Sequence, residues 1–238
     1  MNSTGSMFSH IECTSCKKNF SKNKILKLCP EPECGKVLFP KYDLDQKKSK
    51  NCIDDLKNRK PNMWRYKEFL PVNYEENIVS LGEGYTPILE AENLKTELGI
   101  KKLLIKDESL NPTSSFKARG LSAAVSKAKE LGIKKFSIPT AGNAGGALSA
   151  YAAKAGLESY VFMPNDAPLA NKIEVQYFGA KLELIDGYIN DAGKKSIEIS
   201  SELNLFDVST LKEPYRVEGK KTMGYEIAEQ LNWDLPDN

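Results

Sequence analysis

Short apolar runs alternate with longer segments of helical periodicity from about residue 78 to the end of the chain. Five of these runs have the length of buried strands, and they cover residues 103–105, 136–138, 160–163, 182–185 and 205–208. Repeated alternation of strands and helices with short connections is typical of parallel strands joined by right-handed crossovers. The pattern therefore predicts an α/β fold, in which ligands bind at loops beyond the carboxyl ends of the strands.

Four segments of this region carry helix signals, and they cover residues 121–131, 143–155, 168–178 and 216–231. In the first, apolar side chains recur at spacings of three and four, and Gly132 follows as a stop signal. In the second, small side chains suit close packing against a sheet. In the third, Asp166 can cap the start and Gly179 can end the helix. These helices supply the crossovers that parallel strands require.

The first 77 residues lack this regular pattern. Residues 1–45 are rich in Cys, Lys and Pro, whereas residues 46–77 are first charged and then aromatic. We expect the aromatic side chains of Trp64, Tyr66 and Phe69 to pack against a larger unit. The sequence thus predicts three parts, which are a small N-terminal module (1–45), a connector (46–77) and an α/β region (78–238).

All five cysteines lie in the first 52 residues, and four of them form two pairs. The pairs are Cys13-x2-Cys16 and Cys29-x4-Cys34, with twelve residues between them. Paired thiolates of this kind suit a tetrahedral, structural zinc site in a reducing compartment. The second pair is two residues longer than the usual knuckle, so free thiols are the alternative. We expect Cys52 to be an ordinary thiol and His10 to be a surface residue.

The charges are nearly balanced, with 34 basic and 32 acidic residues. This balance argues against a nucleic-acid coat or a basic membrane patch. No apolar run approaches the roughly 20 residues that cross a bilayer, and the start of the chain does not resemble a signal peptide. The composition therefore predicts a cytoplasmic protein with neither nucleic acid nor membrane as a partner.

A lysine stands at the start of the first predicted helix, in the segment NPTSSFKARG. Pro112 disfavours helix at Asn111, and Ser114 or Ser115 can cap the helix, which puts Lys117 in its first turn. The helix dipole disfavours positive charge there and so favours the neutral amine, the form that attacks an aldehyde to make a Schiff base. A solvated lysine beside a capped helix is the alternative.

The next predicted strand ends in a small, polar turn, PTAGNAGG, at the start of the second helix. Glycines let a backbone approach a ligand closely, and exposed amides at a helix start bind carboxylate or phosphate. The Asn143 side chain can donate a hydrogen bond to a phenolate-type oxygen. A tightly packed helix start is the alternative, but it leaves the polar Thr140 and Asn143 without a role.

Three motifs in this order resemble those of fold-type II pyridoxal-phosphate enzymes. SFKARG resembles their cofactor-lysine motif, AGNAGG their asparagine loop, and LGEGYTPI their G-x-T-P opening. The resemblance runs from about residue 79 to the end, and it implies a parallel-sheet catalytic core in which Lys117 carries the cofactor. It also implies that Asn143 binds the 3′ oxygen, with Ser115 in the cofactor site. The implied substrate-binding residues are Thr86, Thr140, Ala141, Gly142, Asn143 and Ala144.

Two positions depart from the family pattern. Ala118 follows the lysine where Asp is frequent, and Ala141 replaces a Ser, which removes one hydroxyl near the substrate.

The segment PYRVEGKKTMGYEIAEQLNWDLPD resembles the threonine synthase branch more than the serine/threonine dehydratases. The paired cysteines agree with this, because a zinc-ribbon-like preface is common in that branch.

The resemblance implies a lyase reaction that converts O-phosphohomoserine and water into threonine and phosphate, with pyridoxal phosphate as electron sink. Lys117 would move protons at the substrate carbons. Lys106 and Arg119 are candidates for holding the substrate phosphate, although either could be structural. The charged residues Lys220, Lys221 and Glu226 could form a solvated helix face.

The sequence shows neither a second glycine-rich turn for the cofactor phosphate nor a group that faces the pyridine nitrogen. We therefore expect an incomplete fragment that binds pyridoxal phosphate poorly, and a homodimer only for the full-length protein. A threonine/serine dehydratase and a sulfite-using cysteate synthase are alternatives within the family. A non-catalytic zinc-ribbon protein, whose α/β part binds an anion or a partner, is the alternative from another class.

Overall fold

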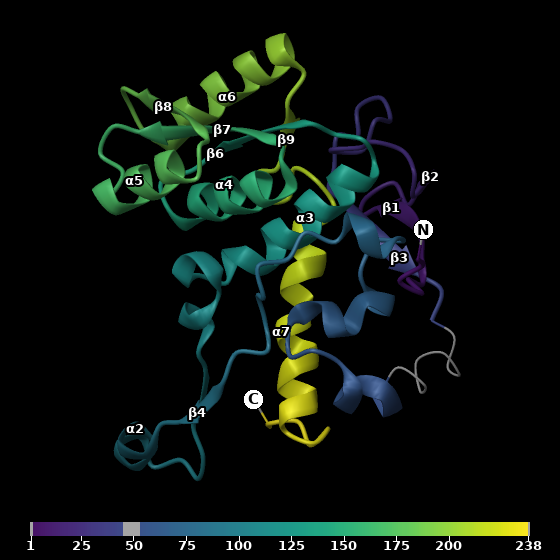
Figure 1. Cartoon of the computed structure of the whole chain (residues 1–238), viewed down its shortest axis with the longest axis vertical. Coiled ribbons are helices and arrows are strands. Elements are labelled where there is room, and N and C mark those ends of the chain that lie inside the picture. Colours follow the sequence, from purple (N-terminus) through teal and green to yellow (C-terminus); the bar gives the residue numbers. More distant parts are fainter. Residues whose placement is uncertain (1, 45–52, 238) are drawn as a thin grey trace.

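The structure is a computed structural model that describes residues 2–44 and 53–237. Cys52 and the first residues of the predicted connector lie outside the described residues, so what the sequence predicts for them stays a prediction. The C-terminal two-thirds form an α/β unit, the N-terminal module lies at one side of it, and a small hairpin projects from it (Figure 1).

A four-stranded parallel sheet with strand order β8-β7-β6-β9 forms the centre of the α/β unit. Its strands are β6 (Lys135–Pro139), β7 (Glu158–Pro164), β8 (Lys181–Ile185) and β9 (Phe206–Asp207). Its helices are α3 (Lys117–Glu130), α4 (Asn143–Ala155), α5 (Leu169–Tyr177) and α6 (Ile189–Leu203). Helix α6 covers one face of the sheet, and α4 and α5 cover the other (Figure 1). The predicted α/β fold with parallel strands is confirmed.

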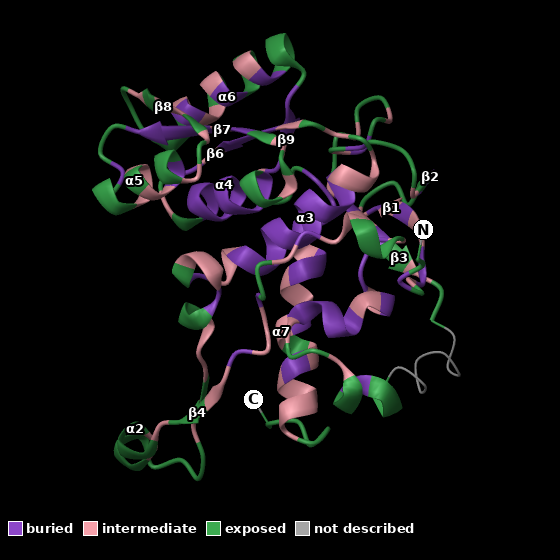
Figure 2. Cartoon of the chain, viewed as in Figure 1, coloured by how far each residue is buried: buried purple, intermediate pink, exposed green. Residues whose placement is uncertain are grey.

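The apolar periodicity of the sequence explains this arrangement. Nearly all of α3, from residue 118 to 128, and most of α4 are buried (Figure 2). The two helices pack against each other, and α4 also contacts strands β6 and β7. Small side chains along α4 allow this close packing, as the sequence predicted. Helix α5 begins after Pro168 without a side-chain cap, so the predicted capping role of Asp166 is wrong.

The first predicted strand does not join the parallel sheet. Strand β5 (Leu104–Lys106) pairs antiparallel with β4 (Ile88–Glu90), and helix α2 (Glu92–Leu98) connects the two. This hairpin projects from the α/β unit and is largely exposed (Figure 2). The prediction of a parallel partner for β5 was wrong, because β5 forms its ladder with β4, its neighbour in the sequence, outside the parallel sheet.

The N-terminal module is a three-stranded antiparallel sheet with strand order β2-β1-β3. Its strands are β1 (Phe8–Cys13), β2 (Asn19–Ser21) and β3 (Leu38–Tyr42).

Short 3-10 turns cover Leu56–Asn58, Met63–Phe69, Glu75–Asn77, Glu108–Leu110 and Pro112–Ser114. The aromatic connector packs as expected, since Trp64 donates to Glu83 and Ser122 while Tyr66 and Phe69 contact the Tyr225 ring edge to face. Among the described residues, no helix combines the length and the apolar character needed to cross a membrane.

Helix α7 (Arg216–Gln230) crosses α3 at very short distance (Figure 1). Two glycines lie at the crossing, Gly120 on α3 and Gly219 on α7. A Cβ atom on Gly219 would overlap the carbonyl oxygen of Arg119, and one on Gly120 would lie 2.9 Å from the carbonyl oxygen of Arg216. The helices can approach this closely only because neither glycine has a side chain.

We therefore expect Gly219→Ala to lower the free energy of unfolding by about 1–3 kcal/mol, because the new methyl group must push two backbones apart. Gly224→Ala is the matched control, because the same helix has open space around Gly224. Alanine there should be neutral or stabilise by up to about 1 kcal/mol. Urea unfolding of both variants measures the difference. Equal effects at the two positions would contradict the close crossing.

Candidate active site

Lys117 is the first residue of α3, and its backbone N–H donates to the hydroxyl of Ser115 at 3.1 Å. Ser115 thus contacts the first N–H of α3, but the N-cap residue of the helix is Phe116, which has no side-chain cap. The two residues before Ser115, Thr113 and Ser114, have φ values of 60° and 49°, in the left-handed region that non-glycine residues rarely adopt. Backbone strain of this kind persists where the surroundings enforce it, and it gathers at functional sites.

The Lys117 side chain is half-buried, and its Nζ lies 3.7 Å from the centre of the Phe116 ring. Within residues 2–44 and 53–237, it forms no ion pair with a carboxylate. Burial and the nearby Arg216 guanidinium lower the pKa of Lys117. A lowered pKa raises the fraction of the neutral amine, which is the nucleophilic form.

Arg216 is a second cationic group of this site, and the sequence reasoning did not single it out. The side chain is 1% exposed, and its Nη1 donates to the Val208 carbonyl at 2.6 Å. Its Nε and Nη2 atoms have no hydrogen-bond partner in the described part of the chain. Since an unpaired buried donor is costly, these N–H groups are suited to an external acceptor.

Lys220 lies one helical turn after Arg216 on α7 and completes a cationic cluster. Its Nζ lies 5.6 Å from the Phe116 ring, and burial, followed by the charges of Arg216 and Lys117, lowers the pKa of Lys220. None of the three cations forms an ion pair with a carboxylate in the ranges that the structure describes. Their positive charge makes this cluster, defined as Lys117, Arg216 and Lys220, an anion-binding arrangement.

Glu213 is a buried carboxyl group near Arg216. Its carboxylate accepts the backbone N–H groups of Tyr215 and Arg216 at 2.7 and 3.0 Å. Burial raises the pKa of Glu213 to about 7. The carboxyl group is thus bound to the backbone at the start of α7, and in the described residues it forms no ion pair with the cluster around Lys117.

The polar turn predicted from PTAGNAGG connects β6 to α4. The Gly142 N–H donates to the Thr140 hydroxyl at 3.2 Å, and Ala144 is buried at the helix start. Ala141 and Asn143 are exposed. The turn at residues 112–114, which precedes Lys117, contacts α4, the helix that begins at Asn143.

The side chain of Asn143 is held from one side. Its Oδ1 accepts a hydrogen bond from Asn171 of α5 at 3.1 Å, which leaves the amide donor Nδ2 for another acceptor. A cofactor oxygen is an acceptor of the kind that this donor would suit. The residues present thus fit the predicted cofactor, with an amine of lowered pKa at one helix start and an amide donor at the next.

Arg119 is fully buried, and all of its N–H groups are already used. The guanidinium donates to Glu108, Glu226, Thr222 and the hydroxyl of Thr86. It therefore has no donor left for a substrate phosphate. The suggestion that Arg119 holds this phosphate is wrong.

Lys106 is engaged in the same buried network. Its Nζ donates to the Thr86 carbonyl at 2.7 Å and to Gln230 at 2.8 Å, and it pairs with Glu226 at 2.8 Å. These three contacts use its three donors, so the suggested phosphate role of Lys106 is wrong as well. Thr86 belongs to the same buried hydrogen-bond network, because its hydroxyl donates to Glu108 at 2.6 Å. Its substrate role stays a prediction.

The suggested solvated face of α7 is also wrong. Glu226 is 0% exposed, Lys221 is half-buried against the Tyr42 ring and pairs with Glu218, and Lys220 belongs to the cationic cluster. Gly219 was the available signal. A glycine inside a helix can serve close packing. Atoms of Arg216 and Lys220 lie near Gly120 at the α3 contact.

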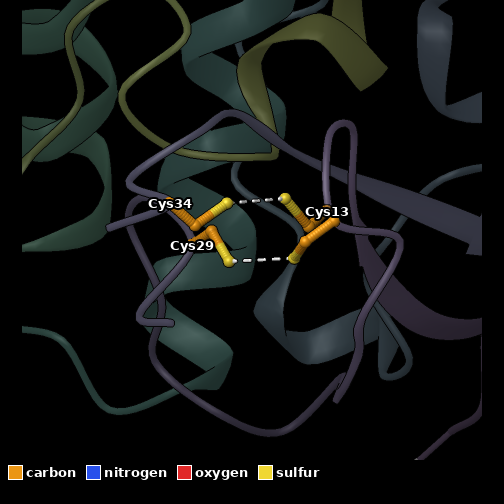
Figure 3. A group of neighbouring side chains, drawn as sticks. Cys13, Cys29 and Cys34 are labelled. Carbon is orange, nitrogen blue, oxygen red and sulfur yellow. Dashed lines mark hydrogen bonds between the residues drawn. The ribbon is translucent and has the colours of Figure 1, made fainter. Parts of the chain in front are cut away.

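The four paired cysteines converge in the N-terminal module, and their sulfur atoms all lie within 4.8 Å of one another. The Sγ–Sγ distances are 3.6 Å between Cys13 and Cys34 and 3.7 Å between Cys16 and Cys29 (Figure 3). Zn–S bonds of about 2.3 Å in tetrahedral geometry place sulfurs roughly 3.8 Å apart, so the cluster can hold zinc. The longer second knuckle still closes, because a residue with positive φ stands on each side of Cys34. His10 is half-buried and does not belong to the cluster.

A family of known proteins matches residues 79–238 and is described as "Pyridoxal-phosphate dependent enzyme". The chain belongs to this family. It is 38% identical over 226 residues to the threonine synthase of Methanocaldococcus jannaschii, covering 94% of this chain and 55% of the relative. It is 35% identical over 229 residues to that of Methanosarcina acetivorans, covering 96% and 55%. The chain thus spans about half the length of these relatives.

Solved structures of pyridoxal-phosphate enzymes share the fold. Maize serine racemase aligns with a TM-score of 0.57 at 24% identity, covering 62% of this chain and 45% of that one. Diaminopropionate ammonia lyase from Escherichia coli, in complex with an aminoacrylate-PLP azomethine reaction intermediate, aligns with a TM-score of 0.60 at 18% identity, covering 95% and 55%. At such identities the likeness shows the fold alone, and it confirms the fold-type II core that the motifs predicted.

Proposed function

We propose that the protein carrying this chain is a pyridoxal-phosphate-dependent threonine synthase, which converts O-phosphohomoserine and water into threonine and phosphate. The single observation that carries the proposal is the cationic cluster. Lys117 is half-buried and has a lowered pKa. It lies near the buried Arg216, whose Nε and Nη2 atoms have no hydrogen-bond partner in the described residues. The relatives named threonine synthase support the same reading.

Within this proposal, pyridoxal phosphate supplies the electron sink, and this chain supplies the groups around it. Lys117 would carry the cofactor and the Nδ2 of Asn143 would donate to its 3′ oxygen, while Ser115 binds the backbone N–H of Lys117. The Lys117 amine, once free, moves a proton at the substrate α-carbon. The substrate carboxylate is held at the turn before α4 and by Thr86, with Thr140, Ala141, Gly142, Asn143 and Ala144 as the contacting residues.

Arg216 and Lys220 would hold the substrate phosphate. A phosphate dianion supplies both the negative charge that the cluster lacks and acceptors for the unpaired Nε and Nη2 of Arg216. A substrate with no second anionic group would leave these donors unsatisfied. This argument favours a phosphorylated substrate over threonine or serine, and hence a synthase over a dehydratase.

The full-length protein should release phosphate and threonine in equal amounts from O-phosphohomoserine. Arg216→Met should lower kcat/KM by about 100-fold, since two charge-assisted hydrogen bonds of roughly 1.5 kcal/mol each correspond to that factor. Lys212→Met, at an exposed lysine of the same region, is the control and should leave the rate unchanged.

Coupled assays of phosphate and threonine distinguish the alternatives. Turnover of threonine without phosphate release would indicate a dehydratase, and a requirement for sulfite would indicate a cysteate synthase. A full-length protein that turns over none of these substrates would favour the non-catalytic alternative. Any of these three results would refute the proposed reaction.

We also propose that Cys13, Cys16, Cys29 and Cys34 bind a structural Zn²⁺. The tetrahedral sulfur spacing supports this, and so does the small size of the module, because a bound metal can stabilise a fold that has little core of its own.

Reduced thiols and balanced charge favour a cytoplasmic protein without nucleic-acid or membrane partners. For the full-length protein we propose a homodimer.

A further inference from the structure

The N-terminal module shares a single apolar cluster with the α/β unit. Cys13 and Cys29 belong to the same buried cluster as Val208 and Tyr215. Figure 3 shows the cysteines beside the chain segment that leads into α7, drawn in olive. We name residues 205–221 the anion segment, because it carries both Arg216 and Lys220.

Side-chain contacts join the module to the anion segment, and one of them places Lys221 Nζ 3.9 Å from the centre of the Tyr42 ring. The Tyr42 hydroxyl donates to Glu218 at 2.6 Å, and Lys27 Nζ donates to the Leu205 carbonyl at 3.1 Å. The Phe8 ring meets the Tyr215 ring edge to face, with centroids 6.5 Å apart. The contacts reach the segment at its start, at its centre and in the first turn of α7.

Each of these bridging residues is close in sequence to a cysteine of the cluster. Phe8 begins the strand that ends at Cys13, and Lys27 precedes Cys29 by two residues. Tyr42 ends the strand that follows Cys34. Because the module is three short strands, a metal at the cysteines would fix the positions of all three bridging residues.

The anion segment has physical reasons to need such support. It contains only the two-residue strand β9 before α7, and Leu211 has a φ of 61°. It also buries the Arg216 charge with two unpaired nitrogen atoms. Burial of an uncompensated charge favours local opening unless the surrounding packing prevents it.

We propose that Zn²⁺ on the four thiolates clamps the anion segment through Phe8, Lys27 and Tyr42, and so keeps Arg216 in its buried position. The inference rests on the proposed zinc site, and it gives the metal a task beyond folding its own module. The metal would then be a positioning element for the anion-binding cluster, at a distance from the reacting atoms.

Hydrogen exchange on the 238-residue chain tests this clamp without any assay of activity. Metal content is measured first, and one zinc per chain is expected. Removal of the zinc by a chelator under reducing conditions should speed amide exchange in residues 205–221 by at least about tenfold. Residues 169–185, in α5 and β8, should change little because, in the described part of the chain, these elements pack mainly on α4 and β7.

A double variant, Lys27→Met/Tyr42→Phe, separates the clamp from the stability of the module. It should retain one zinc per chain and still show faster exchange in residues 205–221. Lys24→Met/Tyr177→Phe makes the same chemical changes at two exposed positions and should match the parent chain.

The outcomes distinguish the two levels of the proposal. A chain that binds no zinc overturns the proposed metal site, and the clamp with it. A zinc-bound double variant whose anion segment exchanges like the parent overturns the clamp alone. If removal of zinc unfolds the entire chain, the zinc-bound double variant decides, since faster exchange confined to residues 205–221 supports the clamp.

Discussion

Replacing Lys117 with alanine in the full-length protein should lower kcat by at least about 1,000-fold, because proton transfer by a positioned side chain alone contributes 10²- to 10⁴-fold. The same change should prevent covalent attachment of pyridoxal phosphate, since no other amine of the cluster stands at the start of α3. Burial and Arg216 lower the pKa of Lys117, so this amine reacts more readily at neutral pH than an exposed lysine.

The matched control is Lys129→Ala, in the last turn of the same helix. Lys129 is half-buried, and its Nζ donates to the Glu76 carbonyl, far along α3 from the cluster. Its loss should leave both kcat and the cofactor content within about twofold, because surface substitutions have small effects. A Lys117→Ala protein with the activity and the yellow chromophore of the parent would contradict the assignment.

The second large effect is expected at Glu226, which is fully buried between Arg119 and Lys106. Glu226→Ala should lower the free energy of unfolding by about 3–5 kcal/mol, because it leaves buried cations without their counter-charge. The network joins the β4–β5 hairpin to α3 and α7, so the hairpin should lose order first. Urea unfolding of the 238-residue chain measures the effect.

A double variant tests whether the loss comes from the unpaired charge. Glu226→Leu/Arg119→Met removes both partners of the main pair, and it should be less destabilised than Glu226→Ala alone. Glu202→Ala, at an exposed position of α6, is the control and should change stability by less than about 0.5 kcal/mol. A loss below about 1 kcal/mol for Glu226→Ala would mean that the network contributes little.

Local periodicity explains what could be predicted from the sequence. Strand β6 and helices α4 and α7 were predicted within about two residues, because apolar spacing and small side chains act within one element. The strand-to-helix turn at Asn143 was equally local. The convergence of the four cysteines also followed from their spacing, although the longer second knuckle left it open.

Burial of charge could not be predicted in the same way. Arg119 and Glu226 are 107 positions apart in the sequence, and they meet only because Gly120 and Gly219 let α3 and α7 cross closely. The same crossing turns Arg216 and Lys220 toward Lys117. A charged helix face and a buried ion-pair network have the same residue spacing, so only the tertiary contact distinguishes them.

The most direct test of the central claim is chemical labelling of the cofactor lysine. Full-length protein is loaded with pyridoxal phosphate, reduced with borohydride and digested, and the modified peptide is located by mass spectrometry. We expect one label per chain, on Lys117. A label on a different lysine, or a bound chromophore that borohydride does not fix to Lys117, would contradict the account.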